Sequence, residues 1–153
     1  MIEQSGTDVI AASGRFDGKI HDFPVRVYFE DTDLSGVVYH ANYLRYPDRA
    51  RADMLELAGI EHAASARLGD AAYAVISADL RYHSPARLND LLVVSSTLIG
   101  LRRVDVRVAH RIRRGDVTLF TAEVTLALLS SSGRPVRHPA DWMERLQRYL
   151  MQK

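Results

Sequence analysis

Residues 103–113 alternate between mostly apolar and mostly charged side chains, which is the pattern of a β-strand with one buried and one solvated face. The buried face would carry Val104, Val106, Val108, His110 and Ile112, and the solvated face Arg103, Asp105, Arg107, Arg111 and Arg113. Arg114-Gly115-Asp116 then leads into a second apolar run at residues 117–129. A turn this short can join only antiparallel neighbours. The chain is therefore constrained to form an antiparallel sheet with one face free for packing.

Three further strands, at residues 24–30, 73–83 and 91–99, and two helices are predicted around this hairpin. The longer helix follows the first strand and repeats apolar residues at spacings of three and four: Tyr43, Tyr46, Ala50, Met54 and Leu57. Asn42 is a plausible N-cap, Gly59 suits the position just past the helix end, and Pro47 predicts an irregular first turn. A polar, Ala-rich connection at residues 60–70 has room for another helical turn, and a short helix is predicted at residues 139–151.

The order strand, long helix, four strands and short helix predicts an α+β fold. The simplest arrangement is a five-stranded antiparallel sheet with the long helix across one face, which buries both apolar surfaces. Exposed sheet edges invite pairing with a second copy of the chain. We interpret residues 1–20 as a flexible N-terminal arm and residues 21–153 as a single domain.

Composition excludes several classes of function. A net charge of +1 over 153 residues does not support binding of nucleic acid through bulk electrostatics. The absence of cysteine excludes disulfides, a thiolate nucleophile and a cysteine metal site. The histidines lack zinc-site spacing, and neither a nucleophile elbow nor a phosphate-binding glycine loop occurs, so no metal is predicted. Without a long apolar run or a signal peptide, we expect a soluble, cytoplasmic protein.

The strongest chemical signal lies between the first strand and the long helix, where Asp33 and His40 flank a turn that contains Gly36. A glycine lets a ligand approach the backbone closely, and the first N–H groups of a helix can hold a developing oxyanion. A nearby carboxylate could attack a carbonyl carbon or activate a water molecule. The same residues could instead form a solvated turn and a surface histidine. The constellation suits acyl transfer to water.

A calcium site is the rival interpretation of this turn. Asp31, Asp33, Ser35 and Gly36 match the first half of an EF-hand loop. The twelfth position would be Asn42 instead of a bidentate Glu, and a strand pattern precedes the loop where an EF-hand has a helix. Both departures make calcium binding the weaker interpretation.

The run Tyr-Phe-Glu-Asp-Thr-Asp-Leu-Ser-Gly-Val-Val-Tyr-His-Ala-Asn-Tyr at residues 28–43 closely resembles the signature of the 4-hydroxybenzoyl-CoA thioesterase-like hotdog proteins. Within them it is most similar to the Tol-Pal-associated acyl-CoA thioesterase branch. The resemblance continues through residues 82–92 and covers about residues 22–140. It implies a hotdog fold, a homodimer or homotetramer, and hydrolysis of acyl-CoA to free acid and CoA. It implies no cofactor, because CoA is part of the substrate.

The resemblance also assigns roles to residues. Asp33 would be the catalytic nucleophile or general base, and the backbone N–H of His40 would polarise the thioester carbonyl while its side chain orients substrate or relays a proton. Gly36, Val38, Tyr39 and Tyr43 would bind substrate, the two tyrosines by lining the acyl or pantetheine channel. Two departures stand out: Pro47 replaces an expected Phe in the helix, and His110 replaces an expected Gln. Because of Pro47, the resemblance does not predict the wall of the acyl pocket, and hence it does not predict the acyl specificity.

Two other classes of function remain possible at this point. A hotdog hydratase or dehydratase would also use a carboxylate and a histidine. A non-catalytic interaction protein of the envelope or of lipid-synthesis machinery is suggested by the arginines at residues 102–114, which are otherwise the solvated face of a strand or phosphate ligands. The sequence does not decide whether CoA or an acyl-carrier protein carries the acyl group.

Overall fold

The computed structural model describes residues 12–60 and 71–152. Its elements are, in chain order, β1 (Arg15–Asp17), β2 (Ile20–Arg26), the 3₁₀ turns η1 (Phe29–Asp31) and η2 (His40–Leu44), α1 (Arg45–Leu57), β3 (Ala72–Tyr82), β4 (Leu91–Leu101), β5 (Asp105–Arg114), β6 (Val117–Leu129) and α2 (Ala140–Gln147). Residues 61–70 of the predicted connection and residues 1–11 of the predicted N-terminal arm lie outside the described residues.

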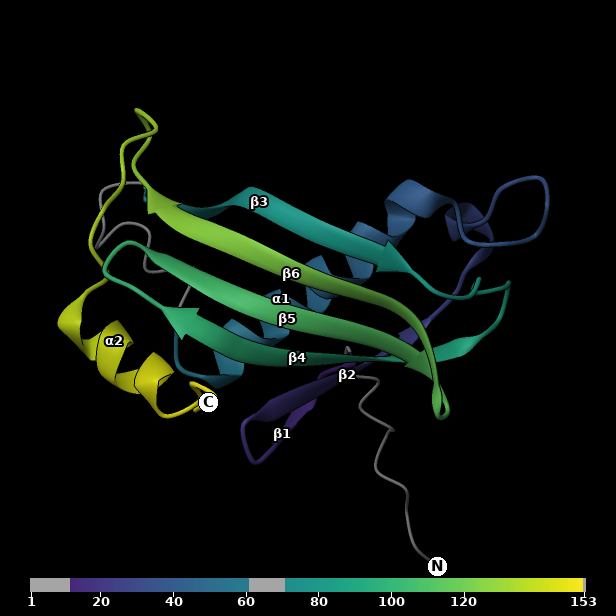
Figure 1. Cartoon of the computed structure of the whole chain (residues 1–153), viewed down its shortest axis with the longest axis horizontal. Coiled ribbons are helices and arrows are strands. Elements are labelled where there is room, and N and C mark those ends of the chain that lie inside the picture. The colour runs from purple at the N-terminus through teal and green to yellow at the C-terminus, as the bar shows by residue number, and fades with distance from the viewer. Residues whose placement is uncertain (1–11, 61–70, 153) are drawn as a thin grey trace, which may run out of the picture.

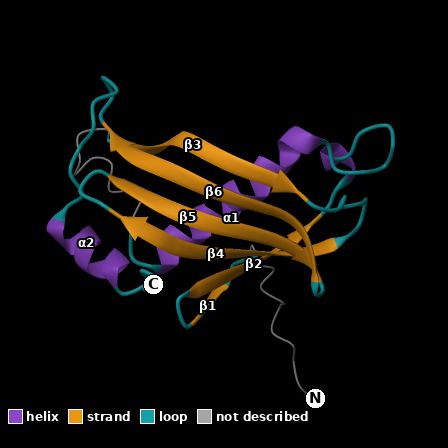
Figure 2. Ribbon diagram, viewed as in Figure 1, coloured by secondary structure: helices purple, strands orange, loops and turns teal. Residues whose placement is uncertain are grey.

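The strands form one sheet in the order β1-β2-β4-β5-β6-β3, and every neighbouring pair is antiparallel. The long helix α1 runs along one face of this sheet, and the short α2 lies beside the end of β4 (Figure 1). The opposite face of the sheet carries no helix (Figure 2) among the residues that the structure describes. The predicted α+β arrangement is therefore confirmed, but the sheet has six strands instead of five.

The additional strand, β1, lies within residues 1–20, which were predicted from the sequence to be a flexible arm. Gly18, with φ +60°, lets the chain reverse so that Arg15–Asp17 pairs with the start of β2. Three residues are too few for an alternation pattern to be recognised, which explains why the strand was missed.

The first predicted strand was displaced toward the C-terminus. β2 ends at Arg26, and Phe29 lies in η1 with 81% of its surface exposed. The carboxylate of Asp31 accepts a hydrogen bond from the backbone N–H of Tyr28 (2.8 Å) and turns the chain out of the strand. A local side-chain bond therefore ends the alternation.

The core lies between α1 and the inner face of the sheet. Val106, Val108, His110 and Ile112 of β5 are buried there, as the alternation predicts. On α1, Tyr46, Ala50 and Met54 face the sheet, whereas Leu57 is 45% exposed and Leu55 is buried in its place. The expected irregular start of the helix is confirmed, because η2 precedes α1 and Pro47 is the third residue of α1.

The helix boundaries were predicted with mixed success. Asn42 is not the N-cap: it lies inside η2, and its side chain bonds to a carbonyl outside the helix. Gly59 follows the last capping residue with φ +85°, as expected of a helix C-terminus. α2 is shorter than predicted but buries Trp142 and Leu146. In the described part of the chain no helix is long and apolar enough to cross a membrane.

Candidate active site

The loop between η1 and η2 is closed by its own backbone. Thr32 and Val38 form an antiparallel bridge, and the N–H of Asp33 donates to the carbonyl of Val37 (2.9 Å). The N–H of Gly36 donates to the carbonyl of Asp33 (3.0 Å). Gly36 has φ +79°, which only glycine adopts without strain. The bridge therefore places the residues around Asp33 beside those that lead into the helix.

Asp33 is exposed at the tip of this loop. Its Oδ1 atom accepts hydrogen bonds from the hydroxyl (2.5 Å) and the backbone N–H (2.8 Å) of Ser35. These bonds, the hydroxyl bond first, hold the pKa of Asp33 below its ordinary value. The carboxylate is therefore ionised at neutral pH, and it is exposed to solvent at the tip of the loop.

Asp31 anchors the loop to the helix start. Its backbone carbonyl accepts hydrogen bonds from the N–H of Tyr39 and from the side-chain amide of Asn42, both at 2.9 Å. The side chain of Asp31 is 4% exposed and is engaged by Tyr28, so it does not join Asp33 in an open acidic cluster. The calcium interpretation loses its geometric basis because the first and third positions of the supposed loop do not share one site.

His40 is the first residue of η2 and is exposed, with its ring 4.4 Å from that of Tyr39, measured between ring centroids. The first N–H groups of a helix have no carbonyl acceptor within the helix and carry its positive dipole end. The carbonyl of His40 accepts a hydrogen bond from the hydroxyl of Tyr82 on β3 (2.8 Å). Asp33 and His40 thus belong to one hydrogen-bonded loop. The side chain of Asp33 bonds to Ser35, and the backbone carbonyl of His40 bonds to Tyr82.

The four residues predicted to bind substrate fall into two pairs. Gly36 and Tyr39 are exposed, Tyr39 with 47% of its surface. Val38 and Tyr43 are 4% and 3% exposed, and both hold the loop in place: the N–H of Val38 donates to the carbonyl of Ala86 (2.9 Å), and the hydroxyl of Tyr43 accepts from the N–H of Ala86 (2.8 Å). In this chain, Val38 and Tyr43 support the site from behind and offer it almost no surface.

Two residues that anchor the site, Asp31 and Tyr82, were not predicted from the sequence to do so. Asp31 could have been recognised, because an Asp three residues after Tyr28 commonly bonds back to a backbone N–H. Tyr82 could not, since 42 residues separate it from His40 and no local pattern links them.

The site lies among exposed apolar side chains. Six of them come from η1, the site loop, the helix start, the segment before β4 and the first residue of β4: Phe29, Leu34, Tyr39, Leu44, Leu88 and Leu91. Leu34, next to Asp33, is fully exposed. Such a concentration of apolar surface around a polar site is typical of a surface that contacts a ligand or another protein.

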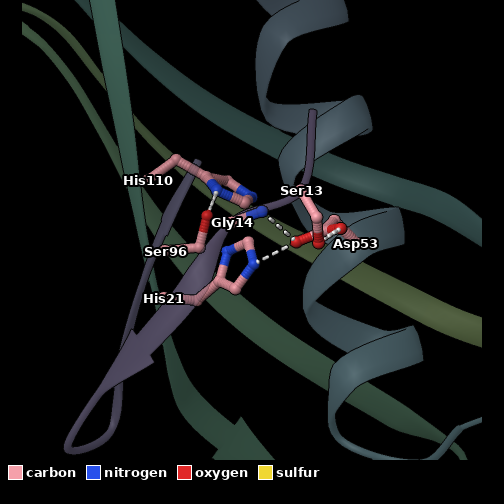
Figure 3. Close-up of polar contacts among 6 residues, drawn as sticks. All are labelled: Ser13, Gly14, His21, Asp53, Ser96 and His110. Carbon is pink, nitrogen blue, oxygen red and sulfur yellow. Dashed lines mark hydrogen bonds and ion pairs between the residues drawn. The ribbon is translucent and has the colours of Figure 1, made fainter. Parts of the chain in front are cut away.

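A second polar cluster lies between the N-terminal segment, α1 and the sheet (Figure 3). Asp53 of α1 accepts hydrogen bonds from the hydroxyl of Ser13 (2.7 Å), the N–H of Gly14 (2.9 Å) and Nε2 of His21 (2.7 Å). The carboxylate lies between the serine and the histidine, so His21 does not contact the hydroxyl that a catalytic triad would have it activate. This cluster, which we call the Asp53 clamp, is structural.

His110 and Ser96 are also buried in this region. Nδ1 of His110 lies 2.8 Å from the Ser96 hydroxyl, and burial, then the charge of Arg51, lowers the pKa of His110 to about 3. His110 is buried and hydrogen-bonded, on the strand face that the alternation predicts to be buried, and Ser96 is out of reach of substrate because it has no exposed surface.

The arginines at residues 102–114 lie mostly on the uncovered face of the sheet and at its hairpins. Arg107 pairs with Glu123 (2.8 Å), Arg102 with Asp105 (2.9 Å) and Arg114 with Asp90 (2.6 Å). A hollow of about 650 Å³ lies on that face, and its lining includes Arg111, Arg113 and Thr121. Among the described residues, no group of three His, Cys, Asp or Glu side chains could hold a metal ion.

Comparison with known proteins gives consistent relatives. The sequence matches the model of the thioesterase-like superfamily over residues 27–146. It is 33% identical over 120 residues to an acyl-CoA thioesterase YbgC of Haemophilus influenzae, covering 78% of this chain and 88% of the relative. It is 38% identical over 103 residues to an acyl-CoA thioester hydrolase YbgC of Escherichia coli O157:H7, covering 67% of this chain and 76% of that protein.

Solved structures agree with the sequence relatives. A probable thioesterase from Bartonella henselae superposes with a TM-score of 0.75 at 33% identity, covering 78% of this chain and 99% of the other. A mutant of 4-hydroxybenzoyl CoA thioesterase, in complex with 4-hydroxybenzoyl CoA, superposes with a TM-score of 0.76 at 21% identity, covering 83% and 98%. The second likeness concerns the fold alone.

Proposed function

Because the chain belongs to the thioesterase-like superfamily, we propose that it hydrolyses acyl-CoA thioesters to free acids and CoA. Its antiparallel sheet around one long helix is the expected hotdog fold, with one strand more than predicted. One observation carries the proposal beyond family membership: an exposed, ionised Asp33 lies on a loop that is hydrogen-bonded onto the first turn of the helix.

Asp33 can act by either of two routes. As a nucleophile, Oδ2 attacks the thioester carbon, the C–S bond breaks, CoA leaves as a thiolate, and water hydrolyses the mixed anhydride to restore the carboxylate. As a general base, Asp33 takes a proton from the water that attacks the same carbon, and the proton passes to the departing thiolate.

The start of η2 would stabilise the charge that develops in either route. The N–H of His40 donates to the thioester oxygen, where a preorganised donor is worth most because negative charge appears there in the transition state. The His40 side chain, which is exposed, orients substrate or relays a proton. Gly36 and Tyr39 supply the surface over which the substrate lies.

The exposed apolar side chains around the loop suggest that a second copy of the chain completes the site. β3 is the last strand of the sheet, so one of its edges has no partner among the described strands. Val75, Ile76 and Tyr82 along β3 are each about half exposed. Pairing of two β3 edges would join two sheets into one and cover this surface. We include a homodimer in the proposal on these grounds.

The test is thiol release from short, long and aromatic acyl-CoAs by wild type and Asp33→Asn. An amide cannot attack as a carboxylate does, so kcat should fall at least about 100-fold. Asp116→Asn, the same change in an exposed hairpin turn, is the matched control and should leave kcat unchanged. Wild-type activity that survives in Asp33→Asn would refute the assignment.

The same experiment separates the alternative functions. Formation or loss of an enoyl thioester without thiol release would indicate a hydratase or dehydratase. Absence of turnover with every acyl-CoA and acyl-carrier-protein thioester tested would leave an interaction protein as the better interpretation. Comparing CoA with carrier-protein thioesters of one acyl chain identifies the acyl donor.

A further inference from the structure

Tyr82 joins the sheet to the first turn of the helix. It is the last residue of β3, and its hydroxyl donates to the carbonyl of His40 over 2.8 Å. Its ring packs edge-on against Tyr43 and Phe120, with ring centroids 5.4 and 5.1 Å apart. The ring is therefore fixed by packing, which aims the hydroxyl at one backbone atom.

The helix start is thus held from two sides. The side chain of Asn42 ties it to the carbonyl of Asp31, and Tyr82 ties it to the edge strand of the sheet. The carbonyl of His40 belongs to the same peptide unit as the N–H of Ala41, so a donor on that carbonyl also polarises the next N–H of the turn. Both anchors restrict where the free N–H groups can point.

Stability alone gives no strong reason for this bond. Tyr82 is 51% exposed, so water could replace the His40 carbonyl as acceptor at little cost. Orientation of the helix start gives a stronger reason for the bond, because electrostatic stabilisation of a transition state depends on donors that are held in place before the reaction begins. We propose that Tyr82 is a positioning residue whose hydroxyl holds the first turn of η2 so that its N–H groups remain directed at the thioester oxygen. The inference rests on the proposed function.

Tyr82→Phe tests it, because this change removes the hydroxyl and keeps the packed ring. We expect kcat for the best acyl-CoA to fall about 10-fold, with KM within about twofold of wild type. The shape of the pH profile should not change, since Tyr82 moves no proton. Tyr73→Phe is the matched control: Tyr73 lies on the same strand, but its buried hydroxyl has no hydrogen-bond partner among the residues that the structure describes, so kcat should be unchanged.

The outcomes separate this inference from the proposed function. If wild type hydrolyses no acyl thioester, or Asp33→Asn remains active, the proposed function fails. If Asp33→Asn is inactive and Tyr82→Phe keeps wild-type kcat, only the positioning role fails. A rise in KM alone would make Tyr82 a substrate contact and overturn the inference. So would a fall in kcat that accompanies a Tm lowered by more than about 2 °C or a changed oligomeric state, since either marks a structural role.

Discussion

The Asp53 clamp yields the sharpest prediction about stability. One carboxylate on α1 holds the N-terminal segment through Ser13 and Gly14 and holds β2 through His21. His21 has no exposed surface, and a Cβ on Gly14 would lie 2.3 Å from the carbonyl of Asp22. Asp53→Ala removes all three hydrogen bonds at once and leaves the buried Nε2 of His21 without a partner.

The expected loss of stability follows from these contacts. A hydrogen bond to a charged group contributes about 1.5–3 kcal/mol. The N-terminal segment can detach and let water solvate Ser13 and Gly14, so the three bonds are not additive, and we expect a loss of about 3 kcal/mol in the free energy of unfolding. For a chain of this length that corresponds to a fall in Tm of about 6–12 °C. Asp53→Asn should lose less, because a rotated amide can accept from Gly14 and His21 while donating to the Ser13 hydroxyl.

The dependence on pH gives this prediction a second signature. Burial works against the charge on Asp53, but hydrogen bonds from Ser13, His21 and Gly14 outweigh it and hold the pKa of Asp53 below its ordinary value. A group that is more acidic in the folded chain contributes stability above its unfolded pKa and loses that contribution as pH falls through the folded value. The difference between wild type and Asp53→Ala should therefore be constant above about pH 5 and shrink below about pH 4.

Urea unfolding measures both effects, with fluorescence of Trp142, the single tryptophan, as the probe. Glu56→Ala is the control, since Glu56 is exposed on the same helix and its removal should change stability little. A loss below about 1 kcal/mol in Asp53→Ala, or a difference from wild type that does not shrink in acid, would refute the assignment of the clamp.

Three further predictions concern the site. Gly36→Ala forces a side chain into φ +79° and should reduce both Tm and thioesterase kcat, the latter measured below the variant's Tm. Ile76→Asp places a charge on the exposed β3 edge and should shift the oligomer toward monomer in sedimentation and lower activity with it. Because the pKa of Asp33 is lowered, protonation of this carboxylate should not reduce kcat/KM between pH 7 and about pH 4. A decrease in kcat/KM near pH 6 that is also seen in His40→Gln would contradict this prediction.

What the sequence could predict depends on how local each interaction is. The β5–β6 hairpin and the buried face of β5 were predicted because alternation and a short turn act within a few residues. Gly59 was placed correctly for the same reason. The predicted C-terminal end of the first strand was wrong, because a single local hydrogen bond from Tyr28 to Asp31 overrides the alternation of apolar and polar residues.

Contacts between distant residues were beyond the reach of the sequence. Asp53 and His21 are 32 residues apart, and Tyr82 and His40 are 42 apart, so neither pair leaves a periodic or spacing signal. Asp53 in particular reads as one of several charged residues on the outer side of an amphipathic helix. The site loop was found because its residues are contiguous, whereas its supports come from β3 and from the segment before β4.

The clamp and the site occupy one helical run, His40–Leu57, yet they should be energetically separable. Asp53 comes thirteen residues after His40, and at a rise of 1.5 Å per residue that is about 20 Å along the axis. Changes this far apart with no shared partner usually add. Asp53→Ala should therefore lower stability and leave kcat at wild-type level well below its Tm, while Tyr82→Phe should do the reverse, and the double variant should show both effects unchanged. A kcat that falls in Asp53→Ala alone would instead mean that the clamp sets the position of the whole helix, and with it the direction of the N–H groups at His40.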